Sequence, residues 1–391
     1  MTERQLALEI IYKTISDNSY TNLLMRHKLN EIEPSKRPFV TNLVIGVLKK
    51  YDYLLFLLKD YIKSNTSTKN KVILTMALYE KIYLNKASYI FNEYVNLGKN
   101  DYDKAFINAV LHNDIKVIKS DNEYINESLP KWLYSLLSKQ YNEEELTKIL
   151  DNYQRIPTIY YRINHHKKLS VKDIDFVNKN IFTSENNLLN SEEFKEGQFY
   201  IQDINSASLY ENLDLKDDDY LLDVCSAPGG KLFNCLDIVK PSKAYANELH
   251  ANRLELIKKK ASVLGFEGIH YINYDGRDLN KHFKKKFNKI ILDVPCSGLG
   301  TIGRKPDLKY HIKPENLDEL QTIQSELLDN IKDLLEDKGI LLYSTCTLNK
   351  KENSKQIEKF LANNTNFKLL KEDTIINEFG DCFYFAKLTK E

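Results

Sequence analysis

The sequence contains no apolar run long enough to cross a membrane. Its most apolar window, residues 53–58, is flanked at once by Asp52 and Lys59, whereas a membrane-spanning helix needs about 20 apolar residues. Residues 1–6 also lack the basic and then apolar pattern of a secretory signal peptide. We therefore expect a cytoplasmic protein that does not associate with a membrane.

Cysteine is scarce as well, and its spacing argues against two kinds of small stabilised domain. The five cysteines are an odd number and include no Cys-x-x-Cys pair; they occupy positions 225, 235, 296, 346 and 382. Neither a disulfide framework nor a zinc site is predicted, and no other metal is expected. A reducing cytoplasm suits five free thiols.

Net charge is nearly absent over the whole chain, at +1, but it is unevenly distributed. Residues 1–120 carry 18 Lys and Arg against 12 Asp and Glu. Such a basic segment favours a polyanionic partner. The chain is also rich in Lys, Asn, Ile and Tyr, and an AT-rich genome would produce the same excess without selection for charge. Both explanations stay open.

A length of 391 residues is enough for two or three domains. Residues 1–120 predict an all-α bundle, because their apolar residues recur at the three-and-four spacing of buried helical stripes. The longest stripe runs from Val40 to Ile62, and only two glycines interrupt the segment. Residues 121–200 combine helical sequence with short β-like pieces and predict a small α+β connector.

Residues 201–391 alternate strand and helix patterns, which predict a doubly wound, mostly parallel α/β sheet of Rossmann-like type. The expected strands are 220–224, 243–247, 269–274, 289–294 and 339–344, with a closing strand from Cys382. The expected helices between them are 230–239, 249–264, 316–337 and 351–362.

A glycine-containing turn lies between the first of these strands and its helix, in Asp223-Val-Cys-Ser-Ala-Pro-Gly-Gly-Lys231. Two glycines let the backbone approach a ligand closely at a helix N-terminus. The turn lacks the spacing and the hydroxyl of a phosphate-binding P-loop, and no Gly-x-Gly-x-x-Gly is present. An adenosine cofactor without a pyrophosphate, S-adenosylmethionine, fits this turn better.

Acidic residues follow the next three expected strands, at Glu248, Asp275 and Asp293. Ligands of such sheets bind beyond the carboxyl ends of the strands. A single acid there is usually a helix cap or turn former, but three together suit the ribose hydroxyls and base amine of a nucleoside. Glu248 in particular can accept both hydroxyls of a ribose.

Two cysteines, Cys296 and Cys346, each end an expected central strand, so we expect both to face one crevice. A thiolate is a strong nucleophile. Cytosine C5 becomes nucleophilic only after an addition across its C5–C6 bond, and one thiol could make that addition while the other assists release. Asp293 could hydrogen-bond cytosine N3 or the exocyclic amine as charge develops.

These segments closely resemble motifs of the RNA 5-methylcytosine methyltransferases, the Nol1/Nop2/Sun family. The resemblance rests on residues 223–231, on Asp293-Val-Pro-Cys-Ser297 and on Ser344-Thr-Cys-Thr347, and extends over about residues 125–390. It implies that Cys346 is the nucleophile and Cys296 the release cysteine. It also implies cofactor contacts at Cys225, Ser226, Ala227, Pro228, Gly229, Gly230, Lys231, Glu248, Asp275 and Asp293.

Two departures from the family pattern are Leu232, where Thr is usual, and Glu248, where Asp is more common. Neither removes a needed functional group. The first third is similar to the NusB-like RNA-binding domain, and this architecture implies a target cytosine in small-subunit (16S) ribosomal RNA. The phosphate contacts that we expect near the crevice are Arg277, Arg304, Lys305 and Lys309. A monomer is expected.

Three alternatives stay open. The target could lie in another RNA such as tRNA. DNA cytosine methylation would make Cys296 the nucleophile, but no acidic Glu-Asn-Val motif follows it and Cys346 would have no role. A non-catalytic RNA-binding assembly factor could keep the same fold, and the intact Asp293, Cys296 and Cys346 argue against it.

Overall fold

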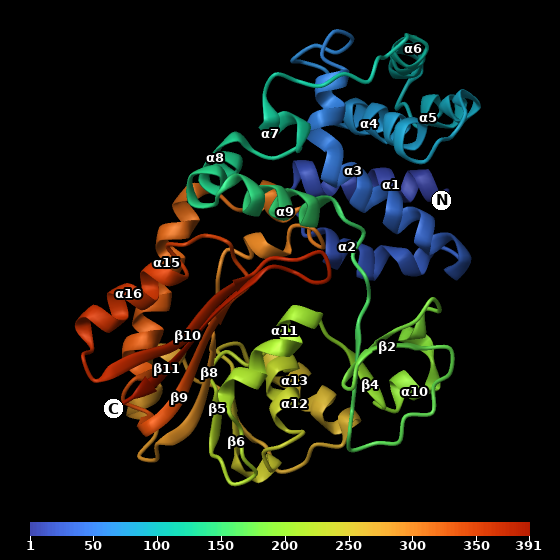
Figure 1. The fold of residues 1–391 in the computed structure, drawn as a ribbon. Helices are drawn as coiled ribbons and strands as arrows, with labels where there is room; N and C mark the ends of the chain where they lie inside the picture. The colour runs from blue at the N-terminus through green and yellow to red at the C-terminus, as the bar shows by residue number, and fades with distance from the viewer. The chain divides into compact units, whose positions relative to one another are not determined.

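The chain folds as two compact units in the computed structural model, which describes residues 1–391 apart from the side chain of Pro241. The first unit comprises residues 1–146 and 302–313, and the second comprises 147–301 and 314–391. Figure 1 gives the course of the chain through its elements. The domain boundaries that we predicted near residues 120 and 200 stay predictions.

The first unit is helical, as predicted. Its helices are α1 (Glu3–Ser16), α2 (Thr21–Lys28), α3 (Arg37–Leu57), α4 (Thr68–Tyr83), α5 (Phe91–Val95), α6 (Asp101–Leu111), α7 (Glu123–Asn126), α8 (Lys131–Gln140) and α14 (Leu308–His311). Side chains satisfy several free N–H groups at the helix starts: Thr2 and Gln5 form a capping box on α1, and Ser67 and Asn100 cap α4 and α6.

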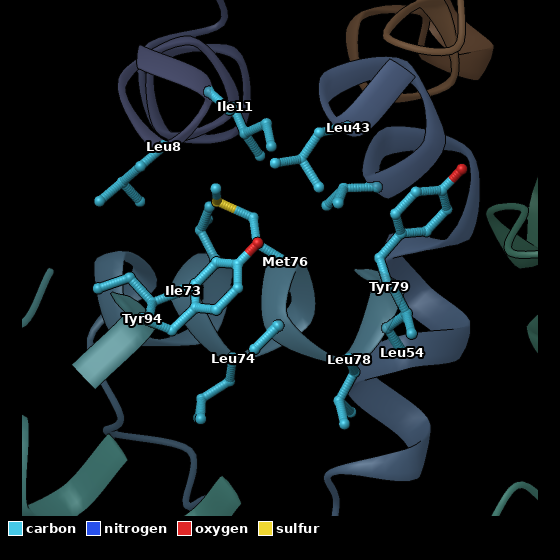
Figure 2. Packing of buried hydrophobic residues seen from close by; sticks show 14 of the residues in the cluster. Leu8, Ile11, Leu43, Leu54, Ile73, Leu74, Met76, Leu78, Tyr79 and Tyr94 are labelled. Carbon is cyan, nitrogen blue, oxygen red and sulfur yellow. The ribbon is translucent and has the colours of Figure 1, made fainter. Parts of the chain in front are cut away.

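The core of this unit lies between α1, α3 and α4. Figure 2 shows Leu8 and Ile11 of α1 and Leu43 of α3 above Met76 and Ile73 of α4. The helices α3 and α4 approach so closely that a Cβ at Gly46 would lie 2.0 Å from the Tyr79 ring, and glycine is therefore required there. The buried Glu80 of α4 is paired with Arg4 at 2.7 Å, which satisfies a charge inside the bundle.

The segment 302–313 belongs to the helical unit and contains a correction to the sequence analysis. Lys309 is 3% exposed, and its ammonium group donates to the backbone oxygens of Lys49 and Ser128. Burial lowers the pKa of Lys309 to about 8. A side chain held in this way has no free surface for an RNA phosphate, so the expectation of a phosphate contact at Lys309 is wrong. Asp307 accepts from the Thr21 N–H at 3.0 Å and fixes the same segment.

A small antiparallel sheet opens the second unit. Helix α9 (Glu143–Gln154) crosses the boundary between the units and is followed by strands in the order β2-β3-β1-β4. These strands are β1 (Tyr161–Ile163), β2 (Asp175–Asn178), β3 (Ile181–Thr183) and β4 (Phe199–Ile201). Aromatic rings pack its buried face, with Phe182 5.4 Å from Tyr161 and 5.2 Å from Phe199 between centroids. The sequence predicted β1 and β4 but neither β2 nor β3.

A seven-stranded sheet forms the centre of the second unit (Figure 1). Its order is β10-β11-β9-β8-β5-β6-β7. The strands are β5 (Leu221–Asp223), β6 (Ala244–Asn247), β7 (His270–Ile272), β8 (Phe287–Asp293), β9 (Leu335–Thr345), β10 (Phe367–Ile375) and β11 (Phe383–Lys390). Strands β5 to β9 run parallel to one another, whereas β11 pairs antiparallel with both β9 and β10. The predicted Rossmann-like, mostly parallel sheet is confirmed.

Helices surround this sheet because successive strand residues point to opposite faces. Leu221 and Ile291 enter one buried cluster, while Leu222 and Ile290 enter another. The helices of the unit are α10 (Glu192–Lys195), α11 (Ile204–Ser208), α12 (Gly230–Cys235), α13 (Ala251–Leu264), α15 (Pro314–Ile331) and α16 (Ser354–Asn363). The helix predicted to reach residue 337 ends at Ile331, and the following strand begins at Leu335.

Candidate active site

A cleft of ≈ 400 Å³ lies at the carboxyl ends of the parallel strands. Seven of the predicted site residues line it: Cys225, Ala227, Glu248, Asp275, Asp293, Cys296 and Cys346. Arg277, predicted as an RNA contact, lines it too. This convergence follows from topology, because the ends of parallel strands meet at one edge of a sheet.

The turn after β5 is held in shape by strand β6. The Ser226 N–H donates to the Asn247 carbonyl at 2.9 Å, and the Asn247 side-chain amide donates to the Val224 carbonyl at 2.9 Å. Gly229 has φ +93°, and a Cβ there would lie 2.5 Å from the Phe233 ring. Only glycine accepts both conditions without strain. Helix α12 begins at the next residue.

Asp223 ends β5 beneath this turn and is 1% exposed. Burial, and then the negative charge of Asp293, raise the pKa of Asp223 to about 7. In the sequence Asp223 is only the first residue of the motif, because nothing in the sequence shows that an acid at the end of a strand is buried.

Glu248 follows β6 and is almost fully buried beside the glycine turn. Its Oε1 accepts from the His250 N–H at 3.1 Å and lies 3.4 Å from the guanidinium of Arg253. Arg253 also donates to the Ala227 carbonyl at 3.1 Å. The arginine thus links the acid to the turn, a link that the sequence does not reveal because Arg253 lies on the exposed side of α13 among other polar residues.

Asp275 and Arg277 form an ion pair on the rim of the cleft. Their side chains are 2.6 Å apart, and hydrogen bonds from Arg277 hold the pKa of Asp275 below its usual value. Arg277 also lies 3.2 Å from Glu326. Two carboxylates therefore balance its charge already, and an RNA phosphate would have to exchange with them.

Lys231 forms an ion pair with Asp293, which lines the cleft. The ammonium group lies 2.6 Å from Asp293 Oδ2, and the Ser344 hydroxyl donates to Oδ1 at 2.8 Å. Burial alone would lower the pKa of Lys231, but the charge and hydrogen bond of Asp293, followed by negative charge at Cys346, raise it. Lys231 is therefore an ammonium ion, and it interacts electrostatically with Cys346.

The sulfur atoms of Cys296 and Cys346 lie 3.4 Å apart. Strands β8 and β9 are neighbours that pair Asp293 with Ser344, so the loops after them carry the two thiols to one point. The hydrogen bond with Cys346, then burial and the negative charge of Cys346, raise the pKa of Cys296 well above its usual value. At neutral pH Cys296 therefore keeps its proton and can donate a hydrogen bond to Cys346.

A buried acid that the sequence analysis missed lies behind the two thiols. Glu352 is 0% exposed and accepts from the backbone N–H and the hydroxyl of Ser297, at 2.9 and 2.6 Å. The Ser297 and Thr347 hydroxyls are in turn 2.7 Å apart. In the sequence, Glu352 stands among lysines and asparagines and looks like the start of a solvated helix, so no signal in one sequence reveals it.

The lining of the cleft fits a nucleoside cofactor. Apolar side chains for a base are present at Val224, Ile323 and Leu327, and Glu248 offers a carboxylate for hydroxyl groups. Gly276 permits this packing, because a Cβ there would lie 2.6 Å from Leu327. Among the described residues, no group of His, Cys, Asp or Glu is arranged to hold a metal ion, and no helix is long and apolar enough to span a bilayer.

The remaining predicted residues lie outside the lining of the cleft. Five of them form the turn and the start of α12, and of these Lys231 donates to Asp293 in the lining: Ser226, Pro228, Gly229, Gly230 and Lys231. Arg304 is exposed and Lys305 is partly exposed in the segment that belongs to the helical unit. Their roles stay predictions.

Comparison with known proteins matches both parts of the chain. Residues 1–116 match the NusB family, and residues 210–384 match the family described as 16S rRNA methyltransferase RsmB/F. The probable ribosomal RNA small subunit methyltransferase B of Bacillus subtilis is 30% identical over 397 residues, covering 93% of this chain and 89% of that protein. The protein of the same description from Synechocystis is 28% identical, and the match covers 94% of this chain and 91% of that protein.

Solved structures share the fold. The crystal structure of PH0851 gives a TM-score of 0.81 at 20% identity and covers 100% of this chain and 99% of that chain. The crystal structure of NSun6 from Pyrococcus horikoshii with SFG gives a TM-score of 0.55 at 19% identity, covering 67% of this chain and 98% of that chain.

Proposed function

Because the chain belongs to the family of 16S rRNA methyltransferases RsmB/F, we propose that it methylates C5 of a cytosine in small-subunit ribosomal RNA through a covalent adduct at Cys346. The observation that carries the proposal is the 3.4 Å separation of the Cys296 and Cys346 sulfurs at the edge of a nucleoside-sized cleft. The cytoplasm suits these free thiols.

S-adenosylmethionine is the cofactor, and when bound it supplies an electrophilic methyl group. The glycine turn after β5 would approach it most closely, with Glu248 on its hydroxyls and Asp275 at the rim. The apolar side chains Val224 and Leu327 would cover its base and exclude water. Cys225, also in the lining, stays a thiol because burial raises its pKa.

In the proposed attack, the Cys346 thiolate adds to C6 of a cytosine that has left its stack. The C5–C6 π electrons move into the ring, and C5 then takes the methyl group. Asp293, an acceptor held by Lys231 and Ser344, would bind the exocyclic amine. The Lys231 ammonium would offset the negative charge that develops on the ring.

In the proposed release, Cys296 removes the proton from C5. Once the Cys346 sulfur is bonded to C6 it no longer carries the charge that helps to keep Cys296 protonated. Cys296 can then lose its proton to solvent and take the proton from C5. The C5–C6 double bond re-forms, the C6–S bond breaks, and Cys346 leaves as a thiolate. One proton is released per methyl group transferred, and both thiols return to their starting states.

The test uses two single variants with a 16S rRNA transcript and labelled S-adenosylmethionine. Cys296→Ala should accumulate an RNA–protein adduct that survives denaturing electrophoresis, and Cys346→Ala should form none. The wild-type product should be 5-methylcytidine by nucleoside analysis. An adduct that survives in Cys346→Ala and disappears in Cys296→Ala would reverse the roles, and methylation at another atom would exclude the proposed reaction.

The choice of RNA is tested separately. We propose phosphate contacts at Arg277, Arg304 and Lys305, of which Arg277 lines the cleft. Because the chain belongs to a family of 16S rRNA methyltransferases, a 16S transcript should be methylated faster than a tRNA mixture of equal nucleotide concentration. Faster methylation of tRNA would move the target to that class and leave the chemistry unchanged.

A further inference from the structure

Glu352 is the point at which the loops of the two active-site thiols are joined. It precedes α16 and is 0% exposed. Its carboxylate accepts four hydrogen bonds, two from Ser297 and one each from Gln324 and Asn349, at 2.6 to 3.1 Å. Two carboxylate oxygens offer about four lone-pair sites, so this acid is saturated. A buried charge is retained at such a position only where every acceptor site is used.

Three of the four donors come from the segments that carry the thiols, and the fourth comes from α15. Ser297 directly follows Cys296, and its hydroxyl also contacts Thr347, which directly follows Cys346. Gln324 of α15 donates both to Glu352 and to the carbonyl of Pro295, at 3.1 and 3.0 Å. The carboxylate thus fixes residues 295 and 297, on both sides of Cys296.

The next residue secures the other thiol. The Asn353 side chain accepts from the Thr345 hydroxyl at 2.6 Å and donates to the Thr347 carbonyl at 2.9 Å. These contacts hold both neighbours of Cys346. Two consecutive residues therefore hold the flanks of both cysteines.

We propose that Glu352 is a positioning residue for methyl transfer, which holds Cys296 against Cys346 as the proton-bearing partner of the nucleophile. This inference rests on the proposed function, because only a covalent reaction needs two thiols at one pyrimidine. Glu352 is fully buried and does not line the cleft, so it would act through Cys296.

The charge of Glu352 supports the proposal that Cys296 is the proton-bearing partner of the nucleophile. The titratable groups that face Cys296 are Tyr343 of β9, Cys346 directly after β9, Asp293 of β8, and Glu352. The pKa of Cys296 is raised first by its hydrogen bond with Cys346, then by its own burial and by the negative charge of Cys346. The negative charge of Glu352 is the next cause. Replacing the carboxylate by an amide would remove this charge and turn one acceptor into a donor that faces other donors.

The experiment measures thiol alkylation in the full-length protein without RNA or cofactor. Initial rates of iodoacetamide modification at Cys296, Cys346 and the buried Cys235 are read by peptide mass spectrometry between pH 6 and 10. In Glu352→Gln, Cys296 should react about tenfold faster at pH 8, because loss of one nearby negative charge lowers a pKa by about one unit. Cys235 is 0% exposed and should stay unreactive, which excludes general loosening of the fold.

The matched control is Glu358→Gln on the exposed side of α16, where the carboxylate is 60% exposed. It should leave the pH profile of Cys296 unchanged. If Glu352→Gln fails to fold, Ser297→Ala removes one of the four donors while keeping the charge. It should detach the loop and raise the Cys296 rate two- to fivefold. An unchanged Cys296 profile in the folded variant overturns the proposal.

The adduct assay separates this proposal from the reaction on which it rests. With 16S RNA, Glu352→Gln should accumulate the covalent adduct as Cys296→Ala does, because Cys296 on a loop that Glu352 no longer holds is misplaced for removing the C5 proton. An adduct in Cys296→Ala but none in Glu352→Gln overturns the role of Glu352 alone. No adduct in Cys296→Ala overturns the proposed function, whatever the alkylation rates.

Discussion

Asp223 allows a test of the electrostatics beneath the glycine turn. Its carboxyl is 1% exposed, and burial followed by the charge of Asp293 raises its pKa from 3.8 to about 7. Asn has the same shape and cannot ionise. In the protein without cofactor, Asp223→Asn should therefore be more stable than the wild type at alkaline pH, although it replaces a residue of the site motif.

The sign follows from proton uptake. Between pH 4 and pH 7 the folded protein holds a proton on Asp223 that the unfolded chain has lost. The free energy of unfolding of the wild type therefore falls as the pH rises through this window and levels off above pH 7. At about 1.4 kcal/mol per pKa unit, the penalty removed by Asn grows from about 1.5 kcal/mol at pH 5 to about 4 kcal/mol at pH 8.

Urea unfolding followed by circular dichroism at pH 5 and pH 8 measures this difference. The free energy of unfolding of Asp223→Asn should exceed that of the wild type by more at pH 8 than at pH 5. The control Asp217→Asn, at an exposed position before β5, should have the wild-type free energy of unfolding at both pH values. Parallel pH profiles for Asp223→Asn and the wild type would refute the reasoning, because they would mean that Asp223 ionises equally in the folded and unfolded states.

Three further outcomes are expected. Lys231→Met removes the ammonium partner of Asp293 and should lower turnover by roughly 10²- to 10³-fold, while calorimetry still detects cofactor binding; wild-type turnover would exclude the electrostatic role. Lys309→Met removes a buried donor to two carbonyls and should lower the free energy of unfolding of the helical unit by about 1–3 kcal/mol, as measured in urea. The affinity of the folded variant for RNA should be unchanged. A loss of RNA affinity without a loss of stability would restore Lys309 as an RNA contact. Treatment with a diazene oxidant should join Cys296 to Cys346 in a disulfide. Mass spectrometry should then find one linked peptide pair that lacks two hydrogens and that dithiothreitol reduces. Persistence of both free thiols would contradict the contact between them.

The parts of the site that the sequence predicted are those that topology decides. Strand and helix patterns alternate from residue 201, and parallel strands end at one edge. Four residues at or just after the ends of these strands were therefore expected together, and all four line the cleft: Glu248, Asp293, Cys296 and Cys346.

The parts that the sequence did not predict depend on tertiary burial. Glu352 and Lys309 are charged residues in polar stretches, and only the folded chain surrounds them with donors or acceptors. Strand β10 was missed because most of its residues are at least partly exposed on a sheet edge, so the alternation of apolar and polar residues is weak. Helix propensity in 332–337 was overridden by pairing of β9 with β8.

The most direct test of the central claim is to identify the residue that bonds to the pyrimidine. RNA containing 5-fluorocytidine should trap the wild-type protein with S-adenosylmethionine, since fluorine at C5 cannot be removed as a proton. Digestion and mass spectrometry should then find the nucleotide on the peptide that contains Cys346. Attachment to Cys296, or the absence of any nucleotide-bearing peptide from methylation-competent protein, would contradict the account.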